Sequence, residues 1–425
     1  MDKSLLVLVF ENIWPIILIY VGIILFFSLL FSRTKRREII VIGLLNYQGL
    51  LGLSVMILLP FIIPIEIEYD SLLLGIFIEL FCTMVFIFSS FKIIWFLRNK
   101  AKPINDRKLA ALILLKLLFF GINYVGSNGR YGIFSESSRI DHLLALPILS
   151  RSFYLELIID FGILASLFLK INVMKRIGIY DLCIIFLMAL FNFLTGSKGQ
   201  IFIYMTSLGL LTYAAFPNFL SDMSKKLLPL IFFCSLIIIG YLYISSVLHE
   251  VTIAQETSLI FARFLLSADA RIMAFDPNVN SYVLSQPHGT LLSELFRGPA
   301  RLLGFSTAEF PIGIYQYQYQ AGVTNYQGST NQLAAMFVIY REDFWFLVFA
   351  LLSVMVFFVF KLFSCLIKSN VPGIAWISAA SLFNLSVTLS GGFDAFVQSV
   401  PIFLIIVLLF FINNRFTENL KLKRS

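Results

Sequence analysis

Arginine side chains gather in two polar stretches of this chain, residues 127–151 and 248–343, which interrupt segments that are almost wholly apolar. A planar guanidinium holds diphosphate oxygens through paired, charge-assisted hydrogen bonds, so these arginines could bind an anionic substrate. Acidic residues are also frequent in 248–343, and ion pairing within the loop is the alternative for any one arginine. Seven of the arginines in these stretches are the candidates: Arg130, Arg139, Arg151, Arg263, Arg271, Arg297 and Arg301.

Two of these arginines belong to a helical pattern. The apolar residues of 257–276 recur with the period of an amphipathic helix, and Arg263, Ser267 and Arg271 are spaced at i, i+4 and i+8 on one stripe of it. We therefore favour substrate binding over ion pairing for Arg263 and Arg271.

A turn of small residues, Thr195-Gly196-Ser197-Lys198-Gly199, separates two apolar segments. Its backbone N–H groups and the ammonium of Lys198 would face one small volume, and the helix expected after the turn adds a positive dipole end. The turn is therefore a candidate phosphate seat. The alternative is an ordinary tight turn whose lysine is solvated or contacts lipid headgroups.

The candidates for a general base are Asp141, Asp269 and His288, which all lie in the polar stretches. His288 stands between Pro287 and Gly289, where a lone histidine is more often an ordinary loop residue. The three histidines are scattered and have no partner at the spacing of metal ligands, so we predict no metal and no cofactor.

Tyrosine and glutamine alternate strictly in Ile314–Gln320. In an extended chain, this alternation places Tyr315, Tyr317 and Tyr319 on one side, where their rings could pack on sugar C–H faces. Asn331 follows closely and could read sugar hydroxyls. The alternative is an edge strand or a polar aromatic loop that binds no ligand.

Two carboxylates, Glu156 and Asp160, are spaced i, i+4 near the outer end of an apolar segment. Exposure to lipid would be costly there, so we expect both to face the bundle interior or a wet cavity. They could pair with a cation or serve as a base, and the same reasoning applies to Glu79 and Lys116.

The composition places the whole chain in a membrane. Its 425 residues are 59% hydrophobic and only 13% charged, with a mean hydropathy of +0.90, whereas soluble domains are about 45–50% apolar. The segments are continuously apolar and do not alternate, which indicates helices and not barrel strands. We predict an all-α, polytopic helical bundle of about eleven spans, at residues 13–32, 39–64, 72–97, 109–126, 152–170, 178–194, 200–216, 227–247, 344–367, 371–389 and 396–412.

The predicted organisation has three parts. Residues 1–247 hold helices 1–8 with the outward loop 127–151, residues 248–343 form one large extracytoplasmic loop, and residues 344–425 hold helices 9–11 and a cytoplasmic tail. The short loops rich in lysine and arginine are expected inside, which puts the amino terminus outside and the carboxyl terminus inside. This topology also explains the net charge of +8, so no nucleic-acid partner is predicted.

In layout and in three short features, the chain resembles the Wzy-type O-antigen and capsular repeat-unit polymerases, which are similar in layout to the O-antigen ligases. The features are the number and placement of spans, the turn Leu194–Gly199, which matches the family's TGS(R/K)G motif, and the segment Asn325–Tyr340 that leads into the next span. The family's pattern of an arginine and a glycine separated by ten residues is met only by Arg151 and Gly162, which runs into a span. Asn331 stands where the ligases have a histidine, which favours a polymerase.

The resemblance implies a metal-independent glycosyltransferase of the bacterial inner membrane that joins undecaprenyl-diphosphate-linked oligosaccharides. It places Lys198 at the diphosphate, and we add Arg263 and Arg271 there, supported by Arg130 or Arg139. A chain-length regulator and a flippase are the expected partners, besides the membrane lipid. The alternatives are a lipid-linked glycan ligase and a polysaccharide flippase or transporter.

Overall fold

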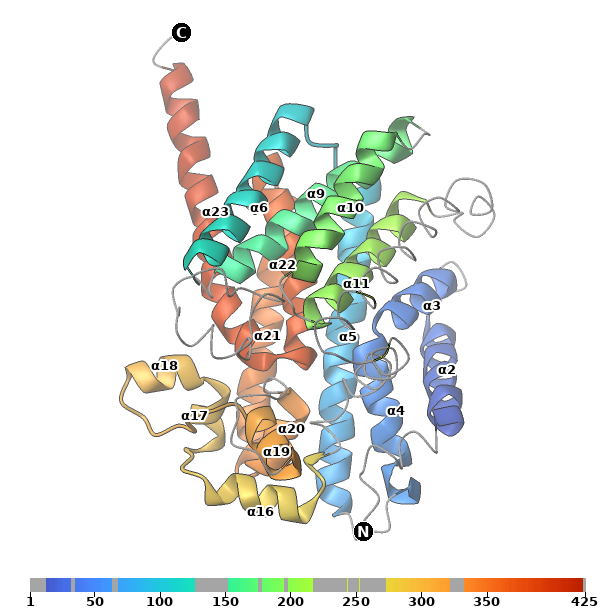
Figure 1. The fold of residues 1–425 in the computed structure, drawn as a ribbon, viewed down its shortest axis with the longest axis vertical. Coiled ribbons are helices and arrows are strands. Elements are labelled where there is room, and N and C mark those ends of the chain that lie inside the picture. The colour runs from blue at the N-terminus through green and yellow to red at the C-terminus, as the bar shows by residue number, and fades with distance from the viewer. Residues whose placement is uncertain are drawn as a thin grey trace. The chain divides into compact units, whose positions relative to one another are not determined.

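The computed structural model describes residues 13–31, 35–62, 68–126, 152–174, 178–194, 198–216, 243, 252, 273–321 and 332–422. These residues form helices joined by turns, and no strand occurs among them (Figure 1). The chain divides into two compact units that do not follow the order of the sequence. Unit 1 comprises residues 1–91, 263–366 and 382–425, and unit 2 comprises residues 92–262 and 367–381.

Seven helices of the described residues are long and apolar enough to cross a membrane. In α9 and α22, 72% and 78% of the most apolar window is buried within the protein, whereas in α21 and α23 the share is 22%. The chain is thus a multi-pass helical membrane protein with central and lipid-facing spans. The seven are α2 (Ile13–Leu30), α5 (Tyr69–Asn99), α6 (Asp106–Gly126), α9 (Ser152–Met174), α21 (Trp345–Leu366), α22 (Pro372–Gly391) and α23 (Phe393–Leu422).

The count of eleven spans is met only in part. The expected span 39–64 is broken into α3 (Arg36–Leu45) and α4 (Tyr47–Ile62), which bend by 80°, and counting the pair as one span gives eight. Asn46 lies at the break, where its backbone leaves the helical region at φ −86° and ψ 37°. Helices α10 (Ile179–Leu194) and α11 (Lys198–Ala215) occupy two further expected segments but have shorter apolar stretches. The segment 227–247 lies outside the described residues except for Tyr243.

In unit 2, α9 packs against α6, α10 and α11. Ile163, Leu164, Ala165 and Leu167 of α9 have no exposed surface, so this helix forms the centre of the unit. The hydroxyl of Tyr204 on α11 donates to the carbonyl of Ile185 on α10 at 2.9 Å, which ties these two shorter helices together.

In unit 1, five helices too short to span a membrane lie between residues 277 and 339 (Figure 1). Two of these helices begin at a typical N-cap residue. Asp276 accepts a hydrogen bond from the Asn278 N–H at 2.9 Å ahead of Pro277, and Thr290 accepts one from the Ser293 N–H at 3.3 Å. These helices are α16 (Pro277–Ser285), α17 (Leu291–Leu295), α18 (Arg297–Leu302), α19 (Ile312–Ala321) and α20 (Leu333–Ile339).

The turn between α16 and α17 fits only a glycine at position 289. A Cβ there would meet the carbonyl oxygen of Ser306 at 2.0 Å and the hydroxyl of Ser293 at 2.1 Å, which no side-chain rotation relieves. By contrast, a Cβ on Gly298 in α18 would meet nothing within 4 Å.

We therefore expect Gly289→Ala to destabilise the short helices by about 1–3 kcal/mol, because the backbone near Ser306 must shift. Limited proteolysis of the detergent-purified protein should show faster cleavage within residues 277–310. Gly298→Ala is the matched control and should be cleaved like the wild type. Equal protection of both variants would contradict the packing described for Gly289.

Candidate functional site

Six polar residues of unit 1 come together around α17, α18 and α20, and we call them the Arg297 cluster. They come from separate elements: two turns, three of the short helices and the start of the span α23. None of the six is adjacent in sequence to another. The members are His288, Glu294, Arg297, Tyr315, Tyr340 and Asp394.

Arg297 is only partly neutralised in this cluster. Its Nη2 lies 3.6 Å from Oδ2 of Asp394, and the two side chains are 14% and 16% exposed. The Nη1 group is buried and has no hydrogen-bond partner among the described residues. A buried N–H without an acceptor is costly, so an anionic or carbonyl oxygen that reached this group would be stabilised there.

Tyr340 ends α20 and directs a second unpartnered group into the protein. Its hydroxyl is buried and has no hydrogen-bond partner among the described residues. Burial raises the pKa of Tyr340 strongly; Glu294 and Tyr315 raise it further, and Arg297 opposes them. The phenol is therefore neutral over the physiological range and can donate a hydrogen bond.

His288 lies beside this phenol, with the two ring centroids 5.3 Å apart. Its Nδ1 is 2.9 Å from the carbonyl oxygen of Gly289. Because a carbonyl oxygen only accepts, Nδ1 must carry a hydrogen, so in the neutral form of the ring Nε2 has the lone pair. The imidazole is exposed, so Nε2 could accept a proton from a bound molecule.

Glu294 holds the turn that carries His288. Its buried Oε1 accepts hydrogen bonds from the Gly289 N–H at 2.8 Å and from the Ala308 N–H at 2.6 Å. Glu342 adds a further tie by accepting from the Leu291 N–H at 3.0 Å. We assign Glu294 a positioning role, because its oxygen joins two loops and does not face solvent.

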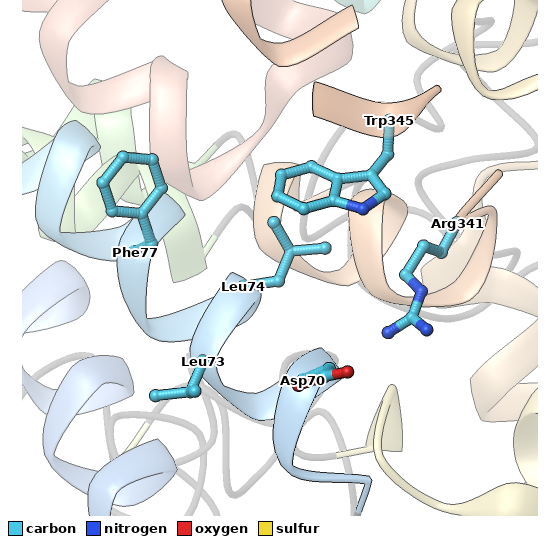
Figure 2. Close-up of a pocket in the computed structure, with 6 residues that line it drawn as sticks. All are labelled: Asp70, Leu73, Leu74, Phe77, Arg341 and Trp345. Carbon is cyan, nitrogen blue, oxygen red and sulfur yellow. The ribbon is translucent and has the colours of Figure 1, made fainter. Parts of the chain in front are cut away.

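A pocket of about 350 Å³ lies close by in sequence, at the starts of α5 and α21. Figure 2 shows the Arg341 guanidinium and the Asp70 carboxylate on one side of it, with Leu73 and Phe77 opposite. Leu74 and Trp345 complete the apolar lining. An amphiphilic pocket at the ends of two spans suits a molecule with an apolar chain and a polar end.

The rim of this pocket carries one positive and two negative charges. The Arg341 guanidinium donates to Oε1 of Glu68 at 2.8 Å and to the Ser71 hydroxyl at 3.0 Å, and Asp70 adds a second carboxylate. The Ser71 hydroxyl also donates to Glu68 at 2.5 Å. This rim therefore offers no surplus of positive charge for a diphosphate.

The structure corrects the extended conformation expected for Ile314–Gln320, because this segment lies in helix α19. Residues two apart do not share a helical face, and the three rings accordingly differ in exposure. Tyr315 is buried in the Arg297 cluster, where its hydroxyl accepts from the Phe310 N–H at 3.3 Å, and burial raises its pKa. Tyr317 is half-buried, and Tyr319 is exposed beside the ring of Tyr282 at 5.4 Å. The flat three-ring wall was thus a wrong prediction.

The other predicted site residues are described only in part. Lys198 is the first residue of α11 in unit 2, as expected for a helix that begins at the turn, while its side chain lies outside what the structure describes. The remaining residues lie outside the described ranges altogether: Arg130, Arg139, Asp141, Arg263, Asp269, Arg271 and Asn331.

Sequence reasoning missed Glu294 and the lining of the pocket. It also missed three polar residues of these sites: Tyr340, Arg341 and Asp394. All three stand beside the first residues of spans, where a polar residue reads as an interfacial anchor. The signal in the sequence was their position: Asp394 lies at the start of one span, and Tyr340 and Arg341 lie just before another. Only the fold of the loop between them shows that two of the three share a cluster.

Comparison of the chain with family models, with curated proteins and with solved structures gives no significant match. The sequence and the geometry above are therefore the basis for the function proposed below.

The Glu68–Arg341 contact should make a small, pH-dependent contribution to stability. The Ser71 hydrogen bond and Arg341 hold the pKa of Glu68 below 4.5, so the ionised form favours the fold. Its contribution is present above that pH and is lost as the pH falls through the lowered pKa. For this exposed pair we expect less than about 1 kcal/mol.

Glu68→Gln should therefore lower the thermal midpoint slightly at neutral pH and leave it unchanged in strongly acidic buffer. The control is Asp343→Asn, an exposed carboxylate of the same unit, for which the two conditions should agree. A Glu68→Gln deficit that persists at acidic pH would show that packing, and not charge, explains the loss.

Proposed function

We propose that the chain is an oligosaccharide repeat-unit polymerase that joins undecaprenyl-diphosphate-linked repeat units into O-antigen or capsular polysaccharide. In this reaction an acceptor sugar hydroxyl attacks C1 of the donor glycan, the bond from C1 to the diphosphate oxygen breaks, and the hydroxyl proton passes to a base. The observation that carries the proposal is the Arg297 cluster, which combines a histidine of fixed tautomer with two unpartnered donors.

His288 is the proposed base. Among the sequence candidates it is the one whose side chain the structure describes, since Asp141 and Asp269 lie outside the described residues. Its exposed Nε2 can receive the proton of the attacking hydroxyl while Gly289 holds the ring in place.

Arg297 and Tyr340 are proposed to bind the oxygens on which negative charge develops. Donors fixed before the reaction stabilise this charge without the reorganisation that water requires. The residues proposed from the sequence to hold the diphosphate remain Lys198, Arg263 and Arg271, with Arg130 and Arg139 in support.

The pocket of Leu73, Leu74, Phe77 and Trp345 is proposed to receive part of a prenyl chain. Its lining is mostly apolar, and its rim of Glu68, Asp70 and Arg341 has no excess positive charge, so the diphosphate is proposed to bind at the residues named above. The proposed location is the bacterial inner membrane, with the amino terminus outside, the carboxyl terminus inside, and the loop 248–343 facing outward.

Deleting the chromosomal gene tests the function. We expect the gel ladder of surface glycans to collapse to a single repeat unit, because units still reach the final acceptor but are not joined. A plasmid copy should restore the ladder. An unchanged ladder would exclude the polymerase, and loss of polymer from the acceptor with polymerised lipid-linked glycan retained would identify a ligase.

Replacing His288 tests the mechanism. In His288→Asn the amide N–H can still donate to Gly289, but no proton acceptor of suitable basicity remains. We expect at least about a 100-fold loss of polymer formation from lipid-linked repeat units by the purified enzyme, the usual contribution of a general base. The control is Ser285→Ala, which changes an exposed residue at the end of α16 and should retain activity. Full activity of His288→Asn would remove this residue from the mechanism.

A flippase or transporter is the second candidate, because unit 2 contains buried charges within spans, as substrate and ion pathways do. The same deletion separates the two functions. Loss of a flippase would leave no repeat unit on the surface, whereas loss of a polymerase leaves single units.

A further inference from the structure

Three charged side chains meet inside the membrane-spanning part of unit 2. Lys116 of α6 and the pair Glu156 and Asp160 of α9 are almost wholly buried, with side-chain exposures of 1%, 3% and 9%. The spacing i, i+4 places both carboxylates on one face of α9. The Lys116 Nζ lies 2.7 Å from Glu156 Oε2 and 3.2 Å from Asp160 Oδ2.

The two carboxylates differ in how their oxygens are hydrogen-bonded. Glu156 has a donor at each oxygen, with Lys116 at Oε2 and the Asn123 amide at Oε1 at 3.2 Å. Both donors to Asp160, from Lys116 and from the Asn192 amide at 3.0 Å, contact Oδ2. Its Oδ1 is buried and has no hydrogen-bond partner among the described residues.

Among the described side chains, one ammonium faces two carboxylates, so the charges do not balance if both are ionised. An unpaired charge in a span is costly, and two carboxylates at one site do not both ionise readily. The described side chains of the other helices packed against α9 supply no further cation to this pair. Helix α10 contributes the neutral Asn192, its Asp181 pairs with Lys170, and the described side chains of α11 include no charged group.

We propose that the cluster of Lys116, Glu156 and Asp160 is an intramembrane proton-binding site, with the proton on Oδ1 of Asp160. The assignment follows the contacts: Glu156 has the shorter contact with the ammonium and both oxygens satisfied, so it is the anion. Burying a neutral Oδ1–H in this dry environment also costs less free energy than burying an anionic oxygen without a donor.

A proton fits this site better than a metal cation does. A hard cation requires several oxygen ligands around one point, whereas the ammonium of Lys116 already contacts both carboxylates and would repel it. The amide groups that approach the two carboxylates are N–H donors, which also disfavours a metal.

Infrared spectroscopy of the full-length protein in lipid nanodiscs tests the site, because a protonated carboxyl has a C=O stretching band that an ionised one lacks. We expect this band at neutral pH, a shift of it in D2O, and its loss in Asp160→Asn. It should also be lost in Glu156→Gln, since Asp160 then becomes the sole counter-ion of Lys116 and ionises. Each variant leaves one ammonium and one carboxylate, so both should fold.

Difference spectra against the wild type remove the contribution of other buried carboxyls such as Glu79. Asp181→Asn, which changes a buried carboxylate on α10, is the matched control and should leave the band intact. Persistence of the band in either Asp160→Asn or Glu156→Gln would overturn the proposal. A band that is present in choline buffer and absent in sodium buffer would also overturn it, because sodium would then supply the charge. The infrared measurement needs no glycan substrate, so its result does not depend on whether the protein is a polymerase.

Discussion

A hydrocarbon layer offers no hydrogen-bond partner, so each polar group within a span must find its partner inside the protein. Several hydroxyl groups of the spans meet this constraint locally. Ser54, Ser89 and Ser381 each donate to a backbone carbonyl four residues earlier, at 2.6–2.8 Å. The longer polar side chains meet it between helices, as Lys116 does with two carboxylates. Three of the buried groups that remain unpaired among the described residues, on Arg297, Tyr340 and Asp160, lie in the two sites described above.

The two sites use buried polarity in different ways. In the Arg297 cluster, the unpartnered groups are donors, an arginine N–H and a phenol, and they suit an incoming anion. In the membrane cluster the unpartnered atom is a carboxylate oxygen, which suits an incoming positive charge. The first lies among short helices, and the second between spans, where water is scarce. Each unit of the chain thus has its own polar centre.

The amino-acid pattern predicted the long spans better than residues 277–321, for a physical reason. A span such as α21 or α23 follows from length and hydropathy alone, because lipid fixes its conformation. The helix α19 does not, since the alternation Tyr-Gln-Tyr-Gln indicates period two while tertiary packing places the segment in a helix. Likewise, the i, i+4 spacing of Glu156 and Asp160 predicted that both face the interior of the bundle. The sequence showed Lys116 only as a single charge within a span and did not predict that it pairs with them. Asp394 and Tyr340 come together through the fold of 277–339, which no local signal encodes.

The carboxylate of Glu294 joins the N–H of Gly289 to that of Ala308, two loop segments far apart along the chain. Arg301 reinforces the second segment by donating to the carbonyl oxygens of Ala308 and Glu309. The turn that carries His288 is therefore held by hydrogen bonds and does not form an independent hinge. A movement of the imidazole would therefore also displace the segment around Ala308, which the same carboxylate holds.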